Sequence, residues 1–137
     1  MKQVIVSDID NTVVDEFNRP IPLSVHWLRA ASHHFDIMFL TGRHAEKRRV
    51  TEDLLRKLRI PYTELFMDER GIPYGKQGEP GRAAMKARVI RNLLKTYDVV
   101  LFVDDSKQNR AAVKDLGVET KKPWNLTRDL LDGPLDK

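Results

Sequence analysis

Short apolar runs of strand length alternate along this chain with segments in which apolar residues recur at helical spacing. The runs are rich in Val, Ile, Leu and Phe, which favours buried strands. Strands are expected at residues 3–7, 35–40, 63–67, 98–103 and 118–121. Amphipathic helices are expected between them, at residues 22–31, 50–58, 82–95 and 107–116. In the second of these, the apolar stripe expected to face inward is Val50, Leu54, Leu55 and Leu58.

Strands that are apolar throughout and separated by amphipathic helices are typical of a parallel sheet covered on both faces. The predicted fold class is therefore α/β, a three-layer αβα doubly wound parallel sheet. The segment after the first strand and the Gly- and Pro-rich loop at 68–81 are too short for a separate lid, so no large cap domain is expected. We expect one domain over residues 1–124 and a tail over 125–137 with one weak helical turn.

Composition narrows the chemistry. The chain has 137 residues, the size of one ordinary domain. It has no cysteine, so a metal would need oxygen or imidazole ligands. No leader and no membrane-spanning apolar stretch is recognised, and a cytoplasmic location without membrane association is expected.

The positive charge is unevenly placed. The net charge is +4, but residues 41–60 alone carry +4 and residues 70–95 carry +6. These two basic blocks would suit a polyanionic substrate. Solvated helix faces are the simpler alternative, and charge alone favours it slightly.

Polar side chains follow the predicted strands at the point where each one ends. Asp8 and Asp10 follow the first strand, Thr41 the second, and Asp104 and Asp105 the fourth. Ligands of open α/β sheets bind outside the carboxyl ends of the strands, so these residues should converge on one edge. Paired carboxylates there indicate Mg²⁺-dependent phosphoryl transfer. The alternative is that the aspartates cap helices or form turns.

Four motifs in this order resemble the haloacid dehalogenase superfamily of phosphotransferases. They are Asp8-Ile9-Asp10-Asn11-Thr12, Thr41-Gly42-Arg43, Lys86, and Val103-Asp104-Asp105-Ser106. Within that superfamily the chain resembles in particular the 3′-phosphatase domain of bacteriophage polynucleotide kinase. That closer likeness rests on the Thr-Gly-Arg motif, on the strand leading to Arg70 and Lys86, and on the residues that follow the last motif.

The resemblance implies a role for each motif. Asp8 would be the nucleophile that forms an aspartyl-phosphate, and Asp10 would protonate the leaving alcohol and later activate water. Thr41 would hydrogen-bond a phosphate oxygen, and Lys86 would neutralise charge. The implied cofactor is Mg²⁺. Its ligands would be oxygen atoms of four aspartates: Asp8, Asp10 through its carbonyl, Asp104, and Asp105 directly or through water.

Some assignments leave alternatives open. Thr41 is also an ordinary turn residue, and Lys76 or Lys95 could take the role given to Lys86. Arg43 and Arg70 are expected to bind substrate phosphate, since a guanidinium can fork onto its oxygens. Asn11 stands where Gly is commoner in the family, and Asn tolerates the left-handed backbone that this position needs.

The function expected is removal of 3′-phosphate from polynucleotide ends in DNA or RNA repair, by a phosphoric monoester hydrolase. A nucleotidase or general small-phosphoester phosphatase is the first alternative, and a non-catalytic phosphate- or nucleic-acid-binding module is the second. No ATP site is recognised, because the Gly-rich segment at 71–77 lacks the spacing and the hydroxyl residue of a phosphate-binding loop. The choice of polymer, a cooperating kinase or ligase, and the oligomeric state stay open.

Overall fold

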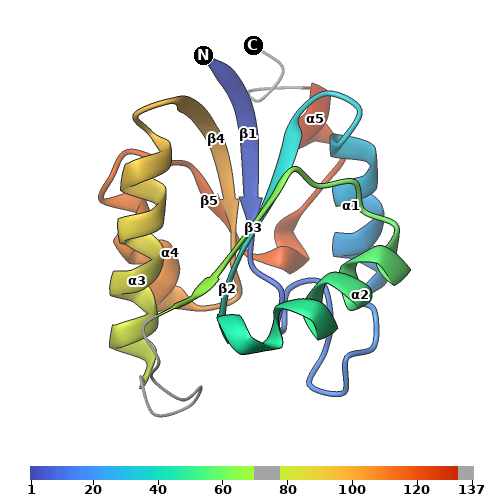
Figure 1. The fold of residues 1–137 in the computed structure, drawn as a ribbon. Coiled ribbons are helices and arrows are strands. Elements are labelled where there is room, and N and C mark those ends of the chain that lie inside the picture. The colour runs from blue at the N-terminus through green and yellow to red at the C-terminus, as the bar shows by residue number, and fades with distance from the viewer. Residues whose placement is uncertain (70–77, 133–137) are drawn as a thin grey trace.

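The strands form one five-stranded sheet in which every neighbouring pair is parallel (Figure 1). The computed structural model describes residues 1–69 and 78–132. Across the sheet the order is β3-β2-β1-β4-β5, which confirms the predicted doubly wound α/β class. The strand bounds are β1 Lys2–Ser7, β2 Asp36–His44, β3 Glu64–Asp68, β4 Tyr97–Val103 and β5 Thr120–Lys121.

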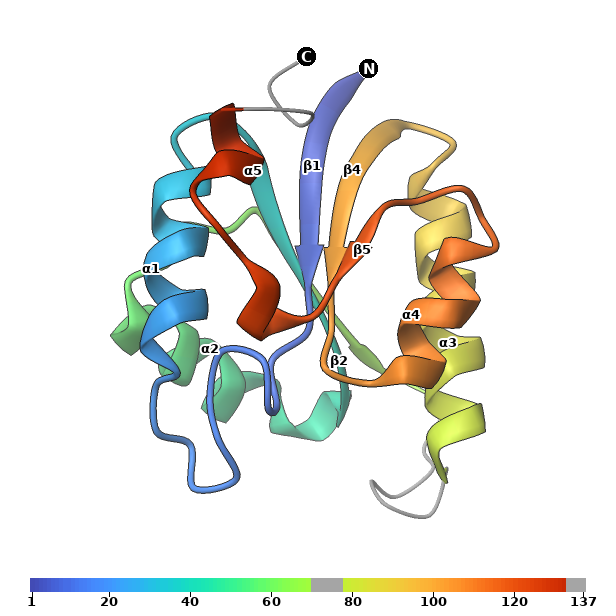
Figure 2. The same cartoon turned by 180° about the vertical axis from the view of Figure 1, so that it is seen from behind.

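Helices cover both faces of this sheet (Figures 1 and 2). The longer ones are α1 Pro22–Ala31, α2 Arg48–Leu58, α3 Gly78–Leu93 and α4 Lys107–Lys114. The short ones are the 3₁₀ turns η1 Ala45–Lys47 and η2 Pro123–Asn125, and α5 Asp129–Asp132. One core lies between the sheet and α1 with α2, and a second lies between the sheet and α3 with α4.

The alternation of side chains along β1 connects the two cores. Ile5 joins the core under α1 and α2, whereas Val4 and Val6 join the core under α3 and α4. All three are fully buried. A strand that is apolar on both faces is what the centre of a two-sided parallel sheet requires.

The winding direction reverses between β1 and β4. The chain passes from β1 to β2 to β3 on one side and then returns across the sheet, so that β4 pairs with the other edge of β1. Asp8 continues this pairing, because its N–H donates to the Val103 carbonyl at 2.9 Å. The carboxyl ends of β1 and β4 therefore form the topological switch point, where open α/β sheets bind their ligands.

Several predicted element boundaries were wrong. β2 runs on through Thr41 and Gly42 to His44, although its register against β3 shifts after Leu40. The predicted 68–81 loop overlaps α3, which begins at Gly78. Val50, expected to face inward, is exposed. Most of the loop, residues 70–77, lies outside the described residues.

The chain beyond residue 124 packs against the fold. Leu126 is buried in the core under α1, and the Trp27 indole N–H donates to the Thr127 carbonyl at 2.8 Å. Trp124 is exposed. The division of the chain at residue 124 stays a prediction. Within the described part of the chain, no helix has the length and apolar character needed to cross a bilayer.

The turn after α4 depends on a left-handed residue. Gly117 has φ +86°, and its N–H donates to the Lys114 carbonyl at 2.9 Å. An added Cβ would meet no atom within 4 Å, so any cost of a side chain here is conformational. We expect Gly117→Ala to lower the free energy of unfolding by about 1 kcal/mol. Gly117→Asn should cost less, because Asn tolerates the left-handed region. Urea denaturation would measure both, and equal losses would contradict this explanation.

Candidate active site

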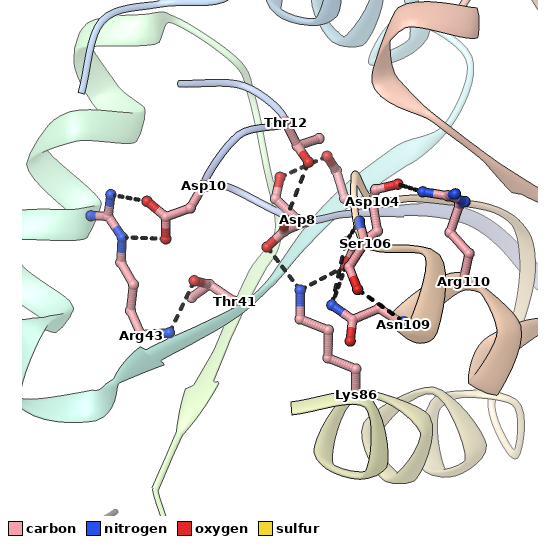
Figure 3. A network of polar contacts seen from close by, with 11 residues as sticks. Asp8, Asp10, Thr12, Thr41, Arg43, Lys86, Asp104, Ser106, Asn109 and Arg110 are labelled. Atoms are coloured by element: carbon pink, nitrogen blue, oxygen red, sulfur yellow. Dashed lines mark hydrogen bonds and ion pairs between the residues drawn. The ribbon is translucent and has the colours of Figure 1, made fainter. Parts of the chain in front are cut away.

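The polar residues that follow the strands converge at the carboxyl edge of the sheet (Figure 3). Asp8 comes from the end of β1 and Asp104 from the end of β4, while Lys86 reaches them from α3. The Lys86 Nζ lies 2.8 Å from Asp8 Oδ1 and 2.7 Å from Asp104 Oδ2. Of the three lysines considered from sequence, Lys86 is therefore the one that the structure brings to the carboxylates; Lys95 is exposed just beyond α3, and Lys76 lies outside the described residues.

This ion triad is almost completely buried. Asp104 has no exposed surface and Lys86 is 2% exposed. Burial alone would lower the pKa of Lys86, but the Asp8 and Asp104 carboxylates outweigh it and raise the pKa above its ordinary value. For Asp8, burial is the largest effect and raises the pKa well above its usual range. Lys86 opposes that shift, while Asp104 and Asp105 add to it.

The loop after β1 holds the Asp8 carboxylate from the other side. The Thr12 hydroxyl donates to Asp8 Oδ2 at 3.3 Å, and the backbone N–H groups of Thr12 and Val13 both bond the Ile9 carbonyl. Asn11, which lies between Ile9 and Thr12, has φ 59°, as expected for a left-handed residue in the place of Gly. The tight turn therefore positions a hydroxyl on the carboxylate that is the candidate nucleophile.

Asp104 is held in place by the first turn of α4. Its Oδ1 accepts the Ser106 N–H at 2.8 Å, and the Asn109 amide donates to both carboxylate oxygens at 3.3 and 3.1 Å. The Arg110 guanidinium donates to the Asp104 carbonyl at 2.9 Å. The N-cap of α4 is Ser106, whose hydroxyl accepts the Asn109 N–H. The alternative that the aspartate pair caps this helix is therefore wrong.

Asp10 faces a different partner. The Arg43 guanidinium donates two hydrogen bonds to its carboxylate, from Nε at 3.0 Å and from Nη2 at 2.8 Å. The same guanidinium also donates to the Asn18 side-chain carbonyl at 2.9 Å and reaches the Thr51 hydroxyl at 3.4 Å. Sequence reasoning expected Arg43 on substrate phosphate. The structure places it on Asp10, two residues from the candidate nucleophile.

Thr41 is fully buried beside this pair, where its hydroxyl oxygen accepts the Arg43 backbone N–H at 3.1 Å. That bond uses a lone pair and not the hydroxyl hydrogen. Gly42, not Thr41, lines the cavity over Asp8 and Asp10. Arg70, the other expected phosphate ligand, lies outside the described residues.

The cavity over Asp8 and Asp10 has a volume of about 250 Å³. Sequence reasoning gave no role to two cations at its edge, Arg82 and Lys107. Arg82 precedes Lys86 by one helical turn, and Lys107 is the first residue of α4, so spacing from the recognised motifs was the available signal. The lining of this cavity also includes two amide side chains, those of Asn11 and Asn109.

The carboxylates of Asp8, Asp104 and Asp105 form a group that suits a divalent cation. One oxygen from each lies within 4.8 Å of the others. The group holds three carboxylates against one buried ammonium. Burial and the neighbouring Asp104 raise the pKa of Asp105, while its hydrogen bond with Asp8 lowers it. An all-oxygen set with surplus negative charge fits Mg²⁺. The Asp10 side chain points to Arg43, so only its carbonyl would be available to this group.

Comparison with known proteins finds likeness in structure. No protein-family profile and no curated protein matches the chain. A chain of the Pnkp1/Rnl/Hen1 RNA repair complex superposes with a TM-score of 0.76 at 20% identity, covering 89% of this chain and 42% of that one. A second structure of the Pnkp1/Rnl/Hen1 complex gives 0.72 at 18%, covering 89% and 45%.

The core domain of a protein assigned as a phosphoglycolate phosphatase from Streptococcus pneumoniae TIGR4 gives a TM-score of 0.54 at 14% identity, covering 89% of this chain and 80% of that one. The chain has a haloacid-dehalogenase-like fold. It spans less than half the length of the two repair-complex chains that it matches. At identities of 14–20%, the likeness to these structures shows a shared fold and does not show a shared activity.

Binding of Mg²⁺ to the three carboxylates should stabilise the protein. At a concentration of about 100 times the dissociation constant, one bound ion adds about 2.7 kcal/mol to the free energy of unfolding. We expect a higher Tm in MgCl₂ than in EDTA at equal ionic strength. Asp105→Asn should shrink the difference, whereas Asp98→Asn, on an exposed residue of β4, should leave it unchanged. An equal response in both variants would contradict a site at Asp105.

Arg43→Ala should impair proton donation by Asp10 rather than phosphate binding, because the variant cannot form either hydrogen bond to that carboxylate. For an alkyl phosphate, whose leaving oxygen needs a proton, kcat/KM should fall about tenfold to a hundredfold. For p-nitrophenyl phosphate, whose leaving group needs none, kcat/KM should change little, because kcat/KM reports only the steps up to release of the leaving group. Arg43→Lys should not restore the alkyl rate, since an ammonium cannot form the two-bond fork. Equal reductions on both substrates would instead favour direct phosphate binding.

Proposed function

We propose that this protein is a Mg²⁺-dependent phosphomonoesterase that works through an aspartyl-phosphate and removes 3′-phosphate from polynucleotide ends. One observation carries the proposal. The Asp8 carboxylate lies in a cavity with one oxygen on a buried lysine and the other on a hydroxyl, and a second carboxylate follows two residues later. That arrangement supplies a nucleophile, charge neutralisation and an acid in one place.

In the first step, an Asp8 oxygen attacks phosphorus. The new bond joins that oxygen to phosphorus, and the bond from phosphorus to the ester oxygen breaks. The electron pair leaves with the ester oxygen, which takes a proton from the Asp10 carboxyl and departs as an alcohol. Lys86 and Thr12 hold the Asp8 carboxylate in one orientation, so little rearrangement precedes attack.

In the second step, water attacks the phosphorus of the aspartyl-phosphate. Asp10, now a carboxylate, accepts the proton of that water as the bond between phosphorus and Asp8 breaks. Inorganic phosphate leaves and the Asp8 carboxylate is restored. Arg43 holds Asp10 throughout and fixes where this proton is delivered and received.

Mg²⁺ bound by Asp8, Asp104 and Asp105 would supply positive charge that lets a dianionic phosphate approach the carboxylates. Asp104 already has its oxygens on Lys86, Ser106 and Asn109, which hold it rigidly. Asp105, less deeply buried, is the more accessible of the pair.

The preference for a polymer end is supported by size and charge. A cavity of about 250 Å³ lies below the range of about 300–1,000 Å³ typical of whole small-molecule ligands, which suits a terminal phosphate whose remainder stays outside. Arg82 and Lys107 at its edge favour an anionic remainder. Architectural likeness to chains of an RNA repair complex agrees with this substrate class.

The decisive experiment is Mg²⁺-dependent phosphate release from a 3′-phosphorylated oligonucleotide, beside its 5′-phosphorylated isomer and a 3′-mononucleotide. We expect the 3′-phosphorylated oligonucleotide to give the highest kcat/KM. Asp8→Asn keeps the shape and removes the nucleophile, so it should reduce turnover to the buffer blank while keeping the wild-type circular dichroism spectrum.

Each other outcome supports a different function. A mononucleotide turned over equally well or better would favour a nucleotidase or general small-phosphoester phosphatase with the same chemistry. No turnover of any phosphoester, together with nucleic-acid binding, would favour a non-catalytic binding module. Substantial activity in Asp8→Asn would show that another group attacks phosphorus.

A further inference from the structure

A second groove, lined by none of the residues of the cavity over Asp8 and Asp10, lies between α3 and the edge strand β3. Its volume is about 390 Å³. Three exposed cations line it, Arg88, Arg91 and Lys95, and no acidic residue of the described chain does. In Figure 1, β3 lies toward the viewer with α3 to its left.

These three cations form no ion pair with any residue that the structure describes. Other exposed arginines of the chain do find carboxylates: Arg19 pairs with Asp15, and Arg56 pairs with Asp53. Three positive charges between residues 88 and 95, with no described carboxylate between them, repel one another and create a local positive potential. Such a surface attracts a polyanion.

The lining of the groove is apolar beneath these charges. Phe66 of β3 is half-buried and, with Val89 and Leu93 of α3, contributes to it. An aromatic ring beside a row of cations is the combination that binds single-stranded nucleic acid, in which bases stack on rings while phosphates meet Lys and Arg. An acidic peptide would use the charges but would leave the ring without a matching partner.

The groove and the candidate active site are both lined by residues of α3. Arg88 lies two residues after Lys86, which contacts Asp8. Arg88 and Arg91 lie near the C-terminal end of α3, and Lys95 lies in the turn that follows the helix. α3 begins beside the carboxyl edge of the sheet and runs away from it (Figure 1). A strand whose end lies at Asp8 could therefore follow α3 into the groove, whereas a mononucleotide could not reach it.

We infer that this groove binds the single-stranded body of the polynucleotide whose phosphorylated end is hydrolysed at Asp8. The inference rests on the proposed function for the identity of the substrate. The single-stranded body is assigned to the groove beside α3 and not to the other basic helix, α2. The reason is that the three cations of the groove border an apolar surface with an aromatic ring.

The test uses an unphosphorylated single-stranded oligonucleotide, so that binding is measured without catalysis. Its affinity is measured by fluorescence anisotropy over a range of KCl concentrations for wild type and Arg88→Ala/Lys95→Ala. We expect weaker binding in the variant and a logarithmic salt slope shallower by about 1.4, or about 0.7 for each cation removed from a single-stranded complex. The matched control is Arg49→Ala/Lys57→Ala, which removes the same two residue types from exposed positions of α2 and should leave the slope unchanged.

A third variant isolates the ring. Phe66→Leu keeps an apolar side chain of similar volume, so the fold should persist, but it removes the stacking surface. We expect binding about fivefold weaker or more, with the salt slope unchanged. Thermal melts of all the variants would verify that they fold.

Turnover of p-nitrophenyl phosphate separates this inference from the proposed function, because that substrate is too small to reach the groove. The α3 double variant should keep wild-type kcat/KM on it. One outcome would be that p-nitrophenyl phosphate is not hydrolysed but the α3 variant alone binds the oligonucleotide more weakly. That outcome would support nucleic-acid binding in the groove and contradict the proposed phosphatase activity. Equal weakening of binding in the α2 and α3 variants, or no oligonucleotide binding by the wild type, would contradict the inference that the groove binds single-stranded nucleic acid.

Discussion

The buried contact of Lys86 with Asp8 and Asp104 is the interaction on which the rest of the structure depends. It joins the ends of β1 and β4 to α3, across the point where the winding of the sheet reverses. A buried charge is tolerated only when it is paired and hydrogen-bonded, and removing one partner of such a pair typically costs about 3–5 kcal/mol. The residues that would perform the chemistry are therefore also residues that hold the two halves of the fold together.

The same contact sets the charge state of the site. Burial raises the pKa of Asp8 and that of Asp105, and the neighbouring Asp104 raises both further, because one ammonium cannot neutralise three carboxylates. A nucleophilic carboxylate must be ionised when it attacks. A divalent cation at the three oxygens would favour that ionised form and also admit the phosphate. The protein thus places the candidate nucleophile where three crowded carboxylates are electrostatically unfavourable, which would make cation binding and substrate binding favourable in turn.

The strand ends and their order along the chain could be predicted because both depend on local patterns. A run such as Val4-Ile5-Val6 specifies a buried strand, and the parallel arrangement then brings Asp8 and Asp104 to one edge. The partner of Arg43 could not be predicted, since its long side chain can reach either a phosphate or Asp10, and only the tertiary structure distinguishes them. For the same reason Val50 looked like a core residue: helical spacing gives a face, but the neighbouring element decides whether that face is covered.

The two basic blocks show what sequence leaves undecided about charge. Counting charges cannot distinguish a binding surface from a solvated helix face. The net charge of residues 70–95 includes both Lys86, which is buried in the ion triad, and the exposed cations of the groove. Helical periodicity separates them in space. Lys86 and Arg88 are two residues apart, a rotation of about 200° around the helix, so one side chain enters the ion triad while the other lies along the groove. A single helix can in this way place an ammonium at the candidate nucleophile and cations along a separate groove, and under the proposed function the chemistry at Asp8 would be coupled to the length of the molecule that reaches it.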